Sequence, residues 1–275
     1  MALNFRKMHG LGNDFVILDN RLGDKIFSTE QIRLICDRRF GAGCDQLMLL
    51  EPAQSAGTDC FMRIYNPDAS EAGACGNGTR CVAAMLMEES GRDHCVIETI
   101  SGILACRAVE NGMVEVDMGV PRLNWQDIPL SEERDTLHLG IGDGDTLSDP
   151  VAVGMGNPHC VFFVRDVEKF PVESLGPSVE RHALFPERTN VEFAQIISPS
   201  KIRMRVWERG TGVTQACGSG ACATMVAAAR RGLSSRKAEI VLDGGSLFLE
   251  WREGDDHVLM TGPVAHVYDG CFAAA

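Results

Sequence analysis

Short apolar segments rich in β-branched residues recur along the chain, separated by clusters of Gly, Pro, Asn and Asp. Runs of this length and composition, bounded by turn residues, are typical of β-strands. Two series of them lie in corresponding parts of the two halves, so we expect a mixed sheet in each half. The segments are 14–19 (DFVILD), 46–51 (QLMLLE) and 60–65 (CFMRIY), then 160–166 (CVFFVRD), 190–198 (NVEFAQIIS) and 201–208 (KIRMRVWE).

Two longer segments predict helices that are apolar on nearly every face. Residues 78–89 are rich in helix formers and precede Gly91, and residues 220–231 precede Gly232. A helix without a polar face belongs inside a lobe, with strands around it. Residues 28–40 and 171–185 instead have the pattern of amphipathic surface helices, the first with Ser28 or Thr29 as its N-cap and Gly41 as its terminator.

The two halves of the chain repeat each other. Gly10–Asn13 (GLGN) matches Gly154–Asn157 (GMGN) 144 residues later, and Cys75 matches Cys217 142 residues later. Further matches keep the same order: Gln46 with Asn190, 62–66 with 204–208, Gly102 with Gly245, and Gly119 with Gly262. A period near half the length indicates two copies of one unit. We predict an α+β protein of two homologous lobes related by a pseudo-twofold axis. Each lobe is a mixed, mostly antiparallel sheet wrapped around a central buried helix, with the active site in the cleft between lobes.

The predicted lobes are residues 1–118 and 119–263. Residues 264–272 are expected to return as a strand that completes the N-terminal lobe. Residues 123–150 are acidic and turn-rich, and we expect them to carry the crossover between lobes without any chemistry. The last residues, 271–275 (CFAAA), suggest a frayed tail.

Charge and cysteine content exclude several classes of function. A net charge of −12 and a pI near 5.0 argue against nucleic acid or an anionic membrane as partner. The N-terminal segment lacks the apolar region of a signal peptide, so a cytoplasmic enzyme is predicted. The eleven cysteines are scattered, and none has the C-x-x-C spacing of a zinc or redox motif. We therefore expect reduced thiols and no metal.

The chemistry is suggested by two similar loops, ACGNGTRC (74–81) and ACGSGACAT (216–224). In each, a cysteine stands where a buried helix begins, and the free amides and the helix dipole are expected to lower the pKa of its thiol. The glycines that follow, Gly76, Gly78, Gly218 and Gly220, let a ligand carboxylate approach the backbone amides. Cys81 and Cys222 fall further into the helices and are expected in the core.

Two such loops facing one substrate suit racemisation or epimerisation. One thiolate removes the α-proton of an amino acid, and the opposed thiol returns a proton to the other face. The two helix N-termini stabilise the developing carbanion through its carboxylate. The chain has only five lysines, none of them in a glycine-rich motif. A mechanism without pyridoxal phosphate or another cofactor therefore fits better.

Several motifs together resemble the diaminopimelate epimerase family. They are GLGNDF (10–15), YNPDASEAGACGNGTRC (65–81), GNPHCVFFV (156–164), RTNVEF (188–193) and VWERGTGVTQACGSGACA (206–223). The resemblance runs essentially from end to end. It implies a cofactor-independent epimerase that interconverts LL- and meso-diaminopimelate in lysine and peptidoglycan-precursor biosynthesis, with two lobes and a homodimeric assembly.

The resemblance also implies roles for individual residues. Cys75 and Cys217 would be the acid/base pair, and His159 and Glu208 would tune the thiols. Gly76, Asn77, Gly218 and Ser219 would form the anion cradle around the reacting carboxylate. The remaining ammonium and carboxylate groups of the substrate would be held by Asn13, Gln46, Asn66, Asn157, Asn190, Glu208 and Arg209.

Some positions depart from the family pattern, and some alternatives stay open. Ala69 stands where the family usually has Gly, Gly73-Ala74 replaces a longer pair, and Ser219 replaces a frequent Thr. A proline or hydroxyproline racemase would use the same two-thiol chemistry but would have nothing for Arg209 to bind. A binding protein or a phenazine-type isomerase would not need both cysteines. A thiol hydrolase with His159 as its base would not need a second copy of the loop.

Overall fold

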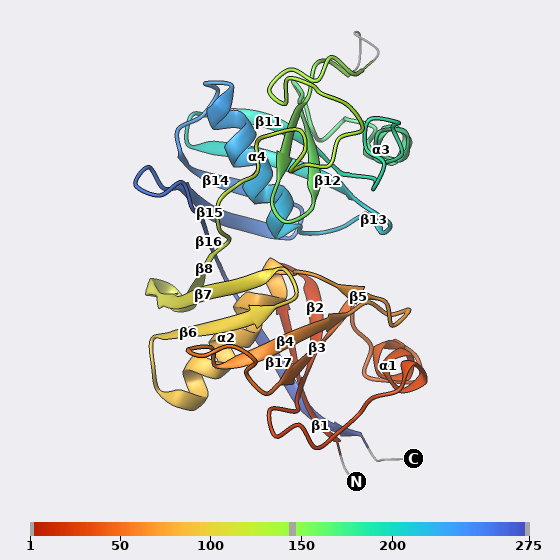
Figure 1. Ribbon diagram of the computed structural model, residues 1–275, viewed down its shortest axis with the longest axis vertical. Coiled ribbons are helices and arrows are strands. Elements are labelled where there is room, and N and C mark those ends of the chain that lie inside the picture. The colour runs from red at the N-terminus through yellow and green to blue at the C-terminus, as the bar shows by residue number, and fades with distance from the viewer. Residues whose placement is uncertain (1–2, 143–146, 273–275) are drawn as a thin grey trace. The chain divides into compact units, whose positions relative to one another are not determined.

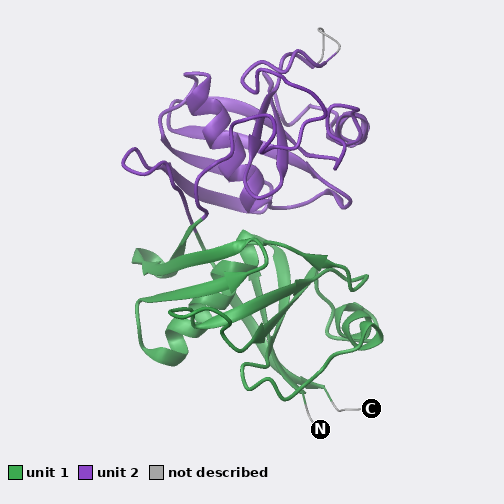
Figure 2. Cartoon of the chain, in the orientation of Figure 1, with its two compact units in different colours: residues 1–117, 262–275 green, residues 118–261 purple. Residues whose placement is uncertain are grey.

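The computed structural model describes residues 3–142 and 147–272. The chain divides into two compact units (Figure 2). The N-terminal lobe consists of Met1–Asp117 and Gly262–Ala275, and the C-terminal lobe consists of Met118–Thr261. The crossover predicted at 123–150 includes residues 143–146, and the predicted tail includes 273–275; both of these short stretches lie outside the described residues.

The N-terminal lobe is a mixed sheet with two α-helices (Figure 1). Its strands pair in the order β17, β1, β2, β3, β4, β6, β7, β8, with the short β5 also on β4; β2 with β3 and β4 with β6 are parallel, and the other pairs are antiparallel. The elements are β1 (Leu3–Gly10), β2 (Asn13–Asp19), α1 (Thr29–Cys36), β3 (Gln46–Glu51), β4 (Cys60–Tyr65), β5 (Glu71–Ala72), α2 (Gly76–Ser90), β6 (His94–Thr99), β7 (Gly102–Val109), the 3₁₀ turn η1 (Glu110–Gly112), β8 (Met113–Asp117) and β17 (Ala265–Phe272).

The C-terminal lobe has the same plan. Its strands pair in the order β9, β10, β11, β12, β14, β15, β16, with the short β13 also on β12; β10 with β11 and β12 with β14 are parallel. The elements are β9 (Val151–Gly154), β10 (Pro158–Phe163), α3 (Val172–Glu180), β11 (Asn190–Ser198), β12 (Lys201–Glu208), β13 (Gly212–Val213), α4 (Gly218–Arg230), β14 (Lys237–Leu242), β15 (Gly245–Trp251) and β16 (Val258–Gly262).

The repeat predicted from the sequence is confirmed in the strand registers. Phe15 lies opposite Gln46, and His159 lies opposite Asn190. Leu47 pairs with Tyr65, and Val191 pairs with Trp207. In each case the second pair is reached from the first by the sequence offset of 144 or 142 residues. The two halves therefore share not only their elements but also the pairing between them.

Each lobe wraps its strands around one buried helix, as the sequence predicts. Helix α2 packs on β1, β2, β6, β7 and β8, and α4 packs on β9 to β12, β14 and β15. Cys81 and Cys222 are fully buried, which confirms them as core residues. Both helices begin two residues earlier than predicted, because Cys75 and Cys217 are themselves the N-caps. Helix α2 ends at Gly91, whose φ of 67° is left-handed, as expected of a C-terminal glycine.

A second helix covers the opposite face of each sheet. Val16 and Leu18 of β2 pack with Ile32 and Ile35 of α1. Because both of its faces are covered, β2 has a continuous apolar sequence where a half-exposed strand would alternate. Helix α1 begins at its Ser28 capping box but ends at Cys36, earlier than predicted.

The two surface helices are shorter than their sequence patterns suggest. After α1, the carboxylate of Asp37 accepts hydrogen bonds from the amides of Arg39 and Phe40, and this closes a turn. Helix α3 ends at Glu180, although the pattern predicted continuation to residue 185. A Cβ at Gly176 of α3 would lie 2.5 Å from Trp207, so the helix packs against β12 at van der Waals contact there.

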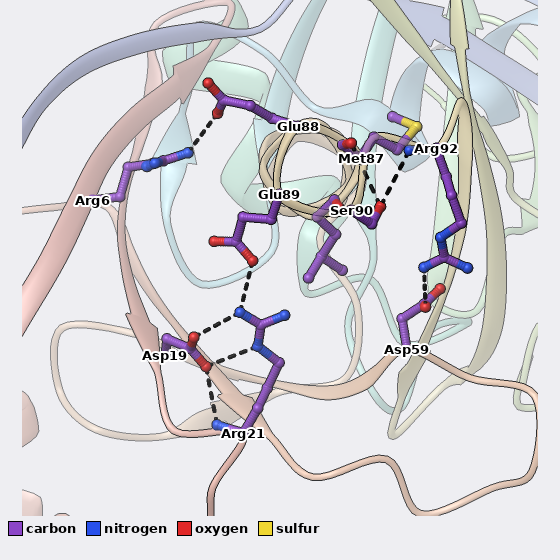
Figure 3. Close-up of polar contacts among 10 residues, drawn as sticks. Arg6, Asp19, Arg21, Asp59, Met87, Glu88, Glu89, Ser90 and Arg92 are labelled. Atoms are coloured by element: carbon purple, nitrogen blue, oxygen red, sulfur yellow. Dashed lines mark hydrogen bonds and ion pairs between the residues drawn. The ribbon is translucent and has the colours of Figure 1, made fainter.

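The end of α2 remote from Cys75 is fixed by polar contacts (Figure 3). Glu88 accepts a hydrogen bond from Arg6 of β1 at 2.8 Å, and Glu89 accepts one from Arg21 at 2.7 Å. Ser90 donates to the carbonyl of Leu86 at 2.7 Å. These contacts join the last turn of α2 to β1 and to the segment after β2, so the helix that carries Cys75 is held at both ends.

The last strand completes the N-terminal lobe. Strand β17 pairs with β1 from Leu3 opposite Phe272 to His9 opposite Ala265, with one irregularity between Lys7 and Met8. Within residues 3–142 and 147–272, no helix combines the length and the apolar character needed to cross a bilayer.

Candidate functional site

The thiol of Cys75 stands at the first turn of α2. Cys75 is the N-cap, with extended backbone angles, and its Sγ accepts a hydrogen bond from the amide of Gly78 at 3.4 Å. A Cβ at Gly78 would lie 2.2 Å from the terminal methyl of Met48 in β3. Met48 therefore fills the space beside Gly78, and a larger residue here would have to displace the end of this side chain.

A fixed amide side chain faces the Cys75 thiol. Asn13 Oδ1 lies 3.9 Å from Cys75 Sγ as a hydrogen-bond acceptor, and it accepts from Asn77 Nδ2 at 3.3 Å. The other end of the amide, Asn13 Nδ2, donates to Asp45 at 3.0 Å. Asp45 is paired with Arg38 at 2.7 Å. The carboxylate therefore sets the orientation of Asn13, and the amide presents its oxygen to Cys75.

The same charged cluster contains Asp14. Burial alone would raise the pKa of Asp14, but hydrogen bonds from Arg38 and Lys7 outweigh burial and lower this pKa to about 2. Asp14 and Asp45 are also joined through the backbone, because the amide of each donates to the side chain of the other. The cluster fixes the turn that carries Asn13.

Two further predicted residues of this lobe bond to each other. Gln46 begins β3, and its Nε2 donates to Asn66 Oδ1 at 3.0 Å. Asn66 follows β4 and donates to Ser70 at 3.0 Å. The turn between them contains Ala69, whose φ of 67° is left-handed. This conformation explains why glycine would suit the position where the sequence departs from the family pattern.

The other departure from the family pattern before Cys75 is Gly73, which lies close to Ser101. A Cβ on Gly73 would lie 2.5 Å from Ser101 Oγ. The loop before Cys75 therefore runs tightly against the turn between β6 and β7, and the shorter residue fits it.

In the C-terminal lobe, Cys217 occupies the position equivalent to Cys75. It is the N-cap of α4, its Sγ accepts from the amide of Gly220 at 3.4 Å, and Ser219 Oγ lies 3.7 Å away. The expectation of a lowered thiol pKa is wrong for Cys217. Burial, together with the nearby carboxylates Glu208 and Glu192, raises its pKa well above the ordinary value. The amide and hydroxyl contacts act in the opposite direction but do not compensate.

Glu208 is the carboxyl group beside Cys217. Burial raises the pKa of Glu208, and the negative charge of Glu192 adds to this effect. Hydrogen bonds with Thr214 and with the Cys217 thiol favour its ionised form and oppose the shift. Glu208 and Cys217 thus compete for negative charge in one buried environment, so the state of each depends on the other.

Asn157 and His159 belong to a chain of hydrogen bonds that starts from a residue the sequence analysis missed. His159 Nε2 lies 2.8 Å from Asn157 Oδ1, and His159 Nδ1 lies 2.7 Å from Oε1 of Glu192 in β11. His159 and Glu192 are both fully buried. The available signal was a glutamate inside the apolar strand RTNVEF, at the position where the repeat has Met48.

The last predicted residues lie around the start of β11 and the end of β12. Asn190 donates from Nδ2 to the carbonyl of Pro158 at 3.1 Å and accepts at Oδ1 from the amide of Arg209 at 3.0 Å. The guanidinium of Arg209 donates to the carbonyl of Glu187 at 3.1 Å. Arg209 is exposed, which leaves its charge accessible to a ligand.

The predicted residues thus form several small contacting sets within each lobe. Asn13, Cys75 and Asn77 touch one another in the N-terminal lobe, with Gln46 bonded to Asn66 close by in the sheet. The C-terminal lobe has two connected sets. One joins Asn157 to His159, and the other joins Glu208 and Ser219 to Cys217. Gly76 and Gly218 are the first residues of their helices. Among the described residues, no three His, Cys, Asp or Glu side chains gather as metal ligands would.

Solved structures with low sequence identity share this fold. A hydroxyproline epimerase from Agrobacterium vitis, with bound trans-4-hydroxy-L-proline, aligns with a TM-score of 0.72 at 16% identity, over 98% of this chain and 91% of that chain. A phenazine biosynthesis protein of the PhzF family from Bacillus anthracis aligns with a TM-score of 0.69 at 17% identity, over 100% of both chains. At these identities the likeness establishes the fold alone.

Sequence comparison is more specific. The family model for diaminopimelate epimerase matches residues 5–124 and 151–267. The diaminopimelate epimerase of Rhodospirillum centenum is 57% identical over 270 residues, which are 98% of this chain and 92% of the relative. That of Gluconobacter oxydans is 53% identical over 273 residues, with 99% and 100% covered. The chain therefore belongs to the diaminopimelate epimerase family.

Proposed function

We propose that this protein is an isomerase that interconverts LL- and meso-diaminopimelate without pyridoxal phosphate, using Cys75 and Cys217 as its two acid/base groups. The observation that carries the proposal is the duplication. In a member of this family, each lobe places a cysteine as the N-cap of its buried helix, with an amide of the first turn donating to the sulfur. The activity belongs to the biosynthesis of lysine and peptidoglycan precursors.

The reaction needs one thiolate and one thiol. The thiolate takes the α-proton, and the electron pair of the C–H bond remains on the α-carbon and its carboxylate. The second thiol then gives its proton to the opposite face of that carbon and becomes the thiolate. After one turnover the two cysteines have exchanged protonation states, so the reverse reaction uses the same groups in exchanged roles. The chemistry requires both sulfurs to reach one α-carbon from opposite faces.

Cys217 is suited to begin as the proton donor in the unliganded protein. Burial and the carboxylates of Glu208 and Glu192 raise the pKa of its thiol, so it holds its proton near neutral pH. Glu208 and His159 tune this balance, Glu208 by direct contact with the thiol. We assign the first proton abstraction from the free enzyme to Cys75, which is partly exposed.

The helix N-termini provide the electrostatic stabilisation. In each lobe the first helical residues, Gly76 and Asn77 or Gly218 and Ser219, present backbone amides where the helix dipole is positive. A reacting carboxylate bound there is stabilised most when negative charge moves onto it in the transition state. The amides of Asn13, Gln46, Asn66, Asn157 and Asn190, with Glu208 and Arg209, are assigned to the other charged groups of diaminopimelate. A guanidinium matches a carboxylate in geometry and charge.

An isotope experiment tests the function. In D₂O, the wild-type protein is expected to exchange deuterium into the α-position of LL-diaminopimelate while forming the meso isomer, as followed by NMR. Cys75→Ala and Cys217→Ala are each expected to reduce turnover by a factor of at least about 10³, because each removes one of the two proton carriers. L-Proline and trans-4-hydroxy-L-proline serve as control substrates. Turnover of these instead of diaminopimelate, or survival of turnover in either alanine variant, would contradict the proposal.

We also propose a homodimer. The support is strand β17, in which Val267 and Tyr268 are exposed large side chains on the last strand of the N-terminal lobe. Light scattering after gel filtration is expected to give twice the mass of the 29.9 kDa chain. A monomeric mass at micromolar concentration would refute this part.

A further inference from the structure

Glu192 is a fully buried carboxyl group whose charge helps to raise the pKa of the Cys217 thiol, but the proposed chemistry does not use its contact with His159. It is the third residue of β11, on the side that packs against the first turn of α4. Its Oε1 is 2.7 Å from His159 Nδ1, while Oε2 is buried without a hydrogen-bond partner among the described residues. A buried carboxyl group is costly unless its environment uses it. Burial raises the pKa of Glu192, although His159 opposes the shift.

The neighbouring structure is shaped around this carboxyl group. A Cβ on Gly220 would stand 2.7 Å from Glu192 Oε1, so the second glycine of the Cys217 loop leaves the space that the carboxyl group occupies. The equivalent neighbour in the N-terminal lobe is Met48, which fills the corresponding space beside Gly78 with an apolar side chain. Because Met48 fills this space without a charged group, packing alone does not account for a carboxyl group at Glu192.

The hydrogen bonds of His159 connect Glu192 to Asn157. Because Asn157 Oδ1 can only accept, the proton on this side belongs to His159 Nε2. A second proton lies in the contact between His159 Nδ1 and Glu192 Oε1, bonded either to the ring nitrogen or to the carboxyl oxygen. The carboxyl group therefore fixes the ring from one side and directs its Nε2–H at Asn157 on the other.

Asn157 is the end of this chain and is partly exposed. With its Oδ1 committed to His159, the group that it keeps for a ligand is its NH₂, a donor. Its repeat equivalent, Asn13, is held in the reverse sense: Asp45 accepts from Nδ2, and Oδ1 is presented to Cys75 and Asn77. Asn13 thus presents its amide oxygen, whereas Asn157 presents its NH₂ group.

We propose that Glu192 is a positioning residue that acts through His159 to fix Asn157 with its NH₂ available to a substrate carboxylate. This inference rests on the proposed function, because Asn157 is a substrate-binding residue only in that function. Glu192 itself touches neither substrate nor the reacting atoms. It supplies the direction of one hydrogen bond, and its loss is expected to weaken substrate binding more than the proton transfer.

The test compares Glu192→Met with Glu192→Gln. Methionine is the residue of the other lobe and has a similar volume, but it cannot hydrogen-bond to His159. It is expected to raise KM for diaminopimelate about tenfold, with a smaller change in kcat, as for loss of one hydrogen bond to a charged group. Glutamine can still hydrogen-bond to Nδ1, and it is expected to keep KM within about threefold of wild type. Equal KM values for both variants and the wild type would overturn the proposal.

A double-mutant cycle separates this relay from a merely structural role. Glu192→Met combined with Asn157→Ala is expected to have the KM of Asn157→Ala alone, because the relay ends at the missing amide. The matched control combines Glu192→Met with Asn66→Ala, an amide of the other lobe, and there the two effects on KM are expected to multiply. Multiplication in the Asn157 cycle would overturn the proposal.

One readout does not depend on activity. The side-chain amide resonances of Asn157, identified by their loss in Asn157→Asp, are expected to shift in Glu192→Met and to stay near their wild-type positions in Glu192→Gln. Unshifted resonances in a folded Glu192→Met protein would overturn the relay even if the enzyme is fully active. If wild-type protein fails to exchange the α-proton of diaminopimelate but the resonances behave as expected, the proposed function fails and the relay stands.

Discussion

The two lobes share the register between the strands that precede their buried helices, β2 to β4 and β10 to β12, but they place their thiols in different electrostatic surroundings. Around Cys75 the equivalent positions hold Phe15, Met48 and Asn66, none of which ionises in the physiological range. Around Cys217 they hold His159, Glu192 and Glu208, whose side chains all carry a titratable group. The two lobes thus share the backbone arrangement around the thiol but differ in the side chains at equivalent positions. A two-base reaction needs one group charged and one neutral at the start, and two identical surroundings would not set that difference.

The largest effect expected from this comparison comes from the second glycine of each loop. Gly220→Ala brings a methyl group against Glu192, which is tied to His159, whereas Gly78→Ala meets the flexible end of Met48. We expect Gly220→Ala to lower kcat/KM about a hundredfold, from displacement of the relay, and Gly78→Ala to lower it less than tenfold. Overpacking at Gly78 is expected to cost about 1–3 kcal/mol of stability. Steady-state kinetics and urea unfolding measure the two quantities.

A second substitution checks the interpretation of the glycine pair. Met48→Ala in the Gly78→Ala background makes room for the added methyl group and is expected to restore part of the lost stability. Equal losses of kcat/KM in Gly78→Ala and Gly220→Ala would mean that both glycines are needed only for the backbone conformation of their loops. The electrostatic difference between the lobes would then not extend to the first helical turn.

A smaller effect, about tenfold, is expected in the reactivity of the two thiols. The raised pKa of Cys217 keeps it protonated below pH 9, and the thiol is also buried, so iodoacetamide should modify it at least about tenfold more slowly than the partly exposed Cys75. The rate at Cys217 should rise with pH throughout the range from 7 to 9, because its thiolate fraction rises. Peptide mass spectrometry over time measures both sites.

The exposed Cys271 is an internal reference for this labelling, because it reports reagent activity at each pH. Modification of Cys217 at the rate of Cys271 at pH 7 would show that the carboxylates around it do not hold its proton in place. The electrostatic difference between the lobes would then have to be abandoned.

The smallest effect concerns the turns after β4 and β12. The C-terminal lobe uses glycine at left-handed positions, Gly210 with φ 76° and Gly212 with φ 100°, whereas the N-terminal lobe has Ala69 at φ 67°. Ala69→Gly is expected to stabilise the protein by about 0.5–1 kcal/mol, since relief of the left-handed strain exceeds the entropy cost of glycine. Thermal unfolding measures it, with Ala72→Gly in the adjoining β5 as the destabilising control. A lower Tm for Ala69→Gly would show that the turn is not strained.

The sequence was most informative where one physical rule decides the outcome. The strand segments follow from short apolar runs bounded by turn residues, and the buried helices follow from their lack of a polar face. Cys81 and Cys222 were correctly expected in the core for the same reason. Helix α1 was predicted too long because the turn made by Asp37 depends on side-chain hydrogen bonds that leave no periodic signal.

The electrostatics of the site were harder to predict. A helix N-terminus favours a thiolate, and the family resemblance added that His159 and Glu208 tune the thiols without giving the direction. The opposing contributions are burial of the thiol and the carboxylates of Glu208 and Glu192, and all of them arise only when β11 and β12 pack on α4. Glu192 was overlooked because a single acidic residue inside an apolar strand gives no periodic pattern. Its significance depends on His159 lying opposite Asn190 in the sheet.

Strand β17 has a consequence for how the protein is made. It pairs along β1, yet all the other strands and helices of the chain are translated between these two strands. The strands and helices of the C-terminal lobe are all synthesised before β17, so that lobe can fold on the nascent chain while β1 still lacks this neighbour. During translation the edge of β1 therefore stays open until β17 is made, and a ribosome stalled shortly before residue 265 would display an unfinished N-terminal lobe to proteases and chaperones.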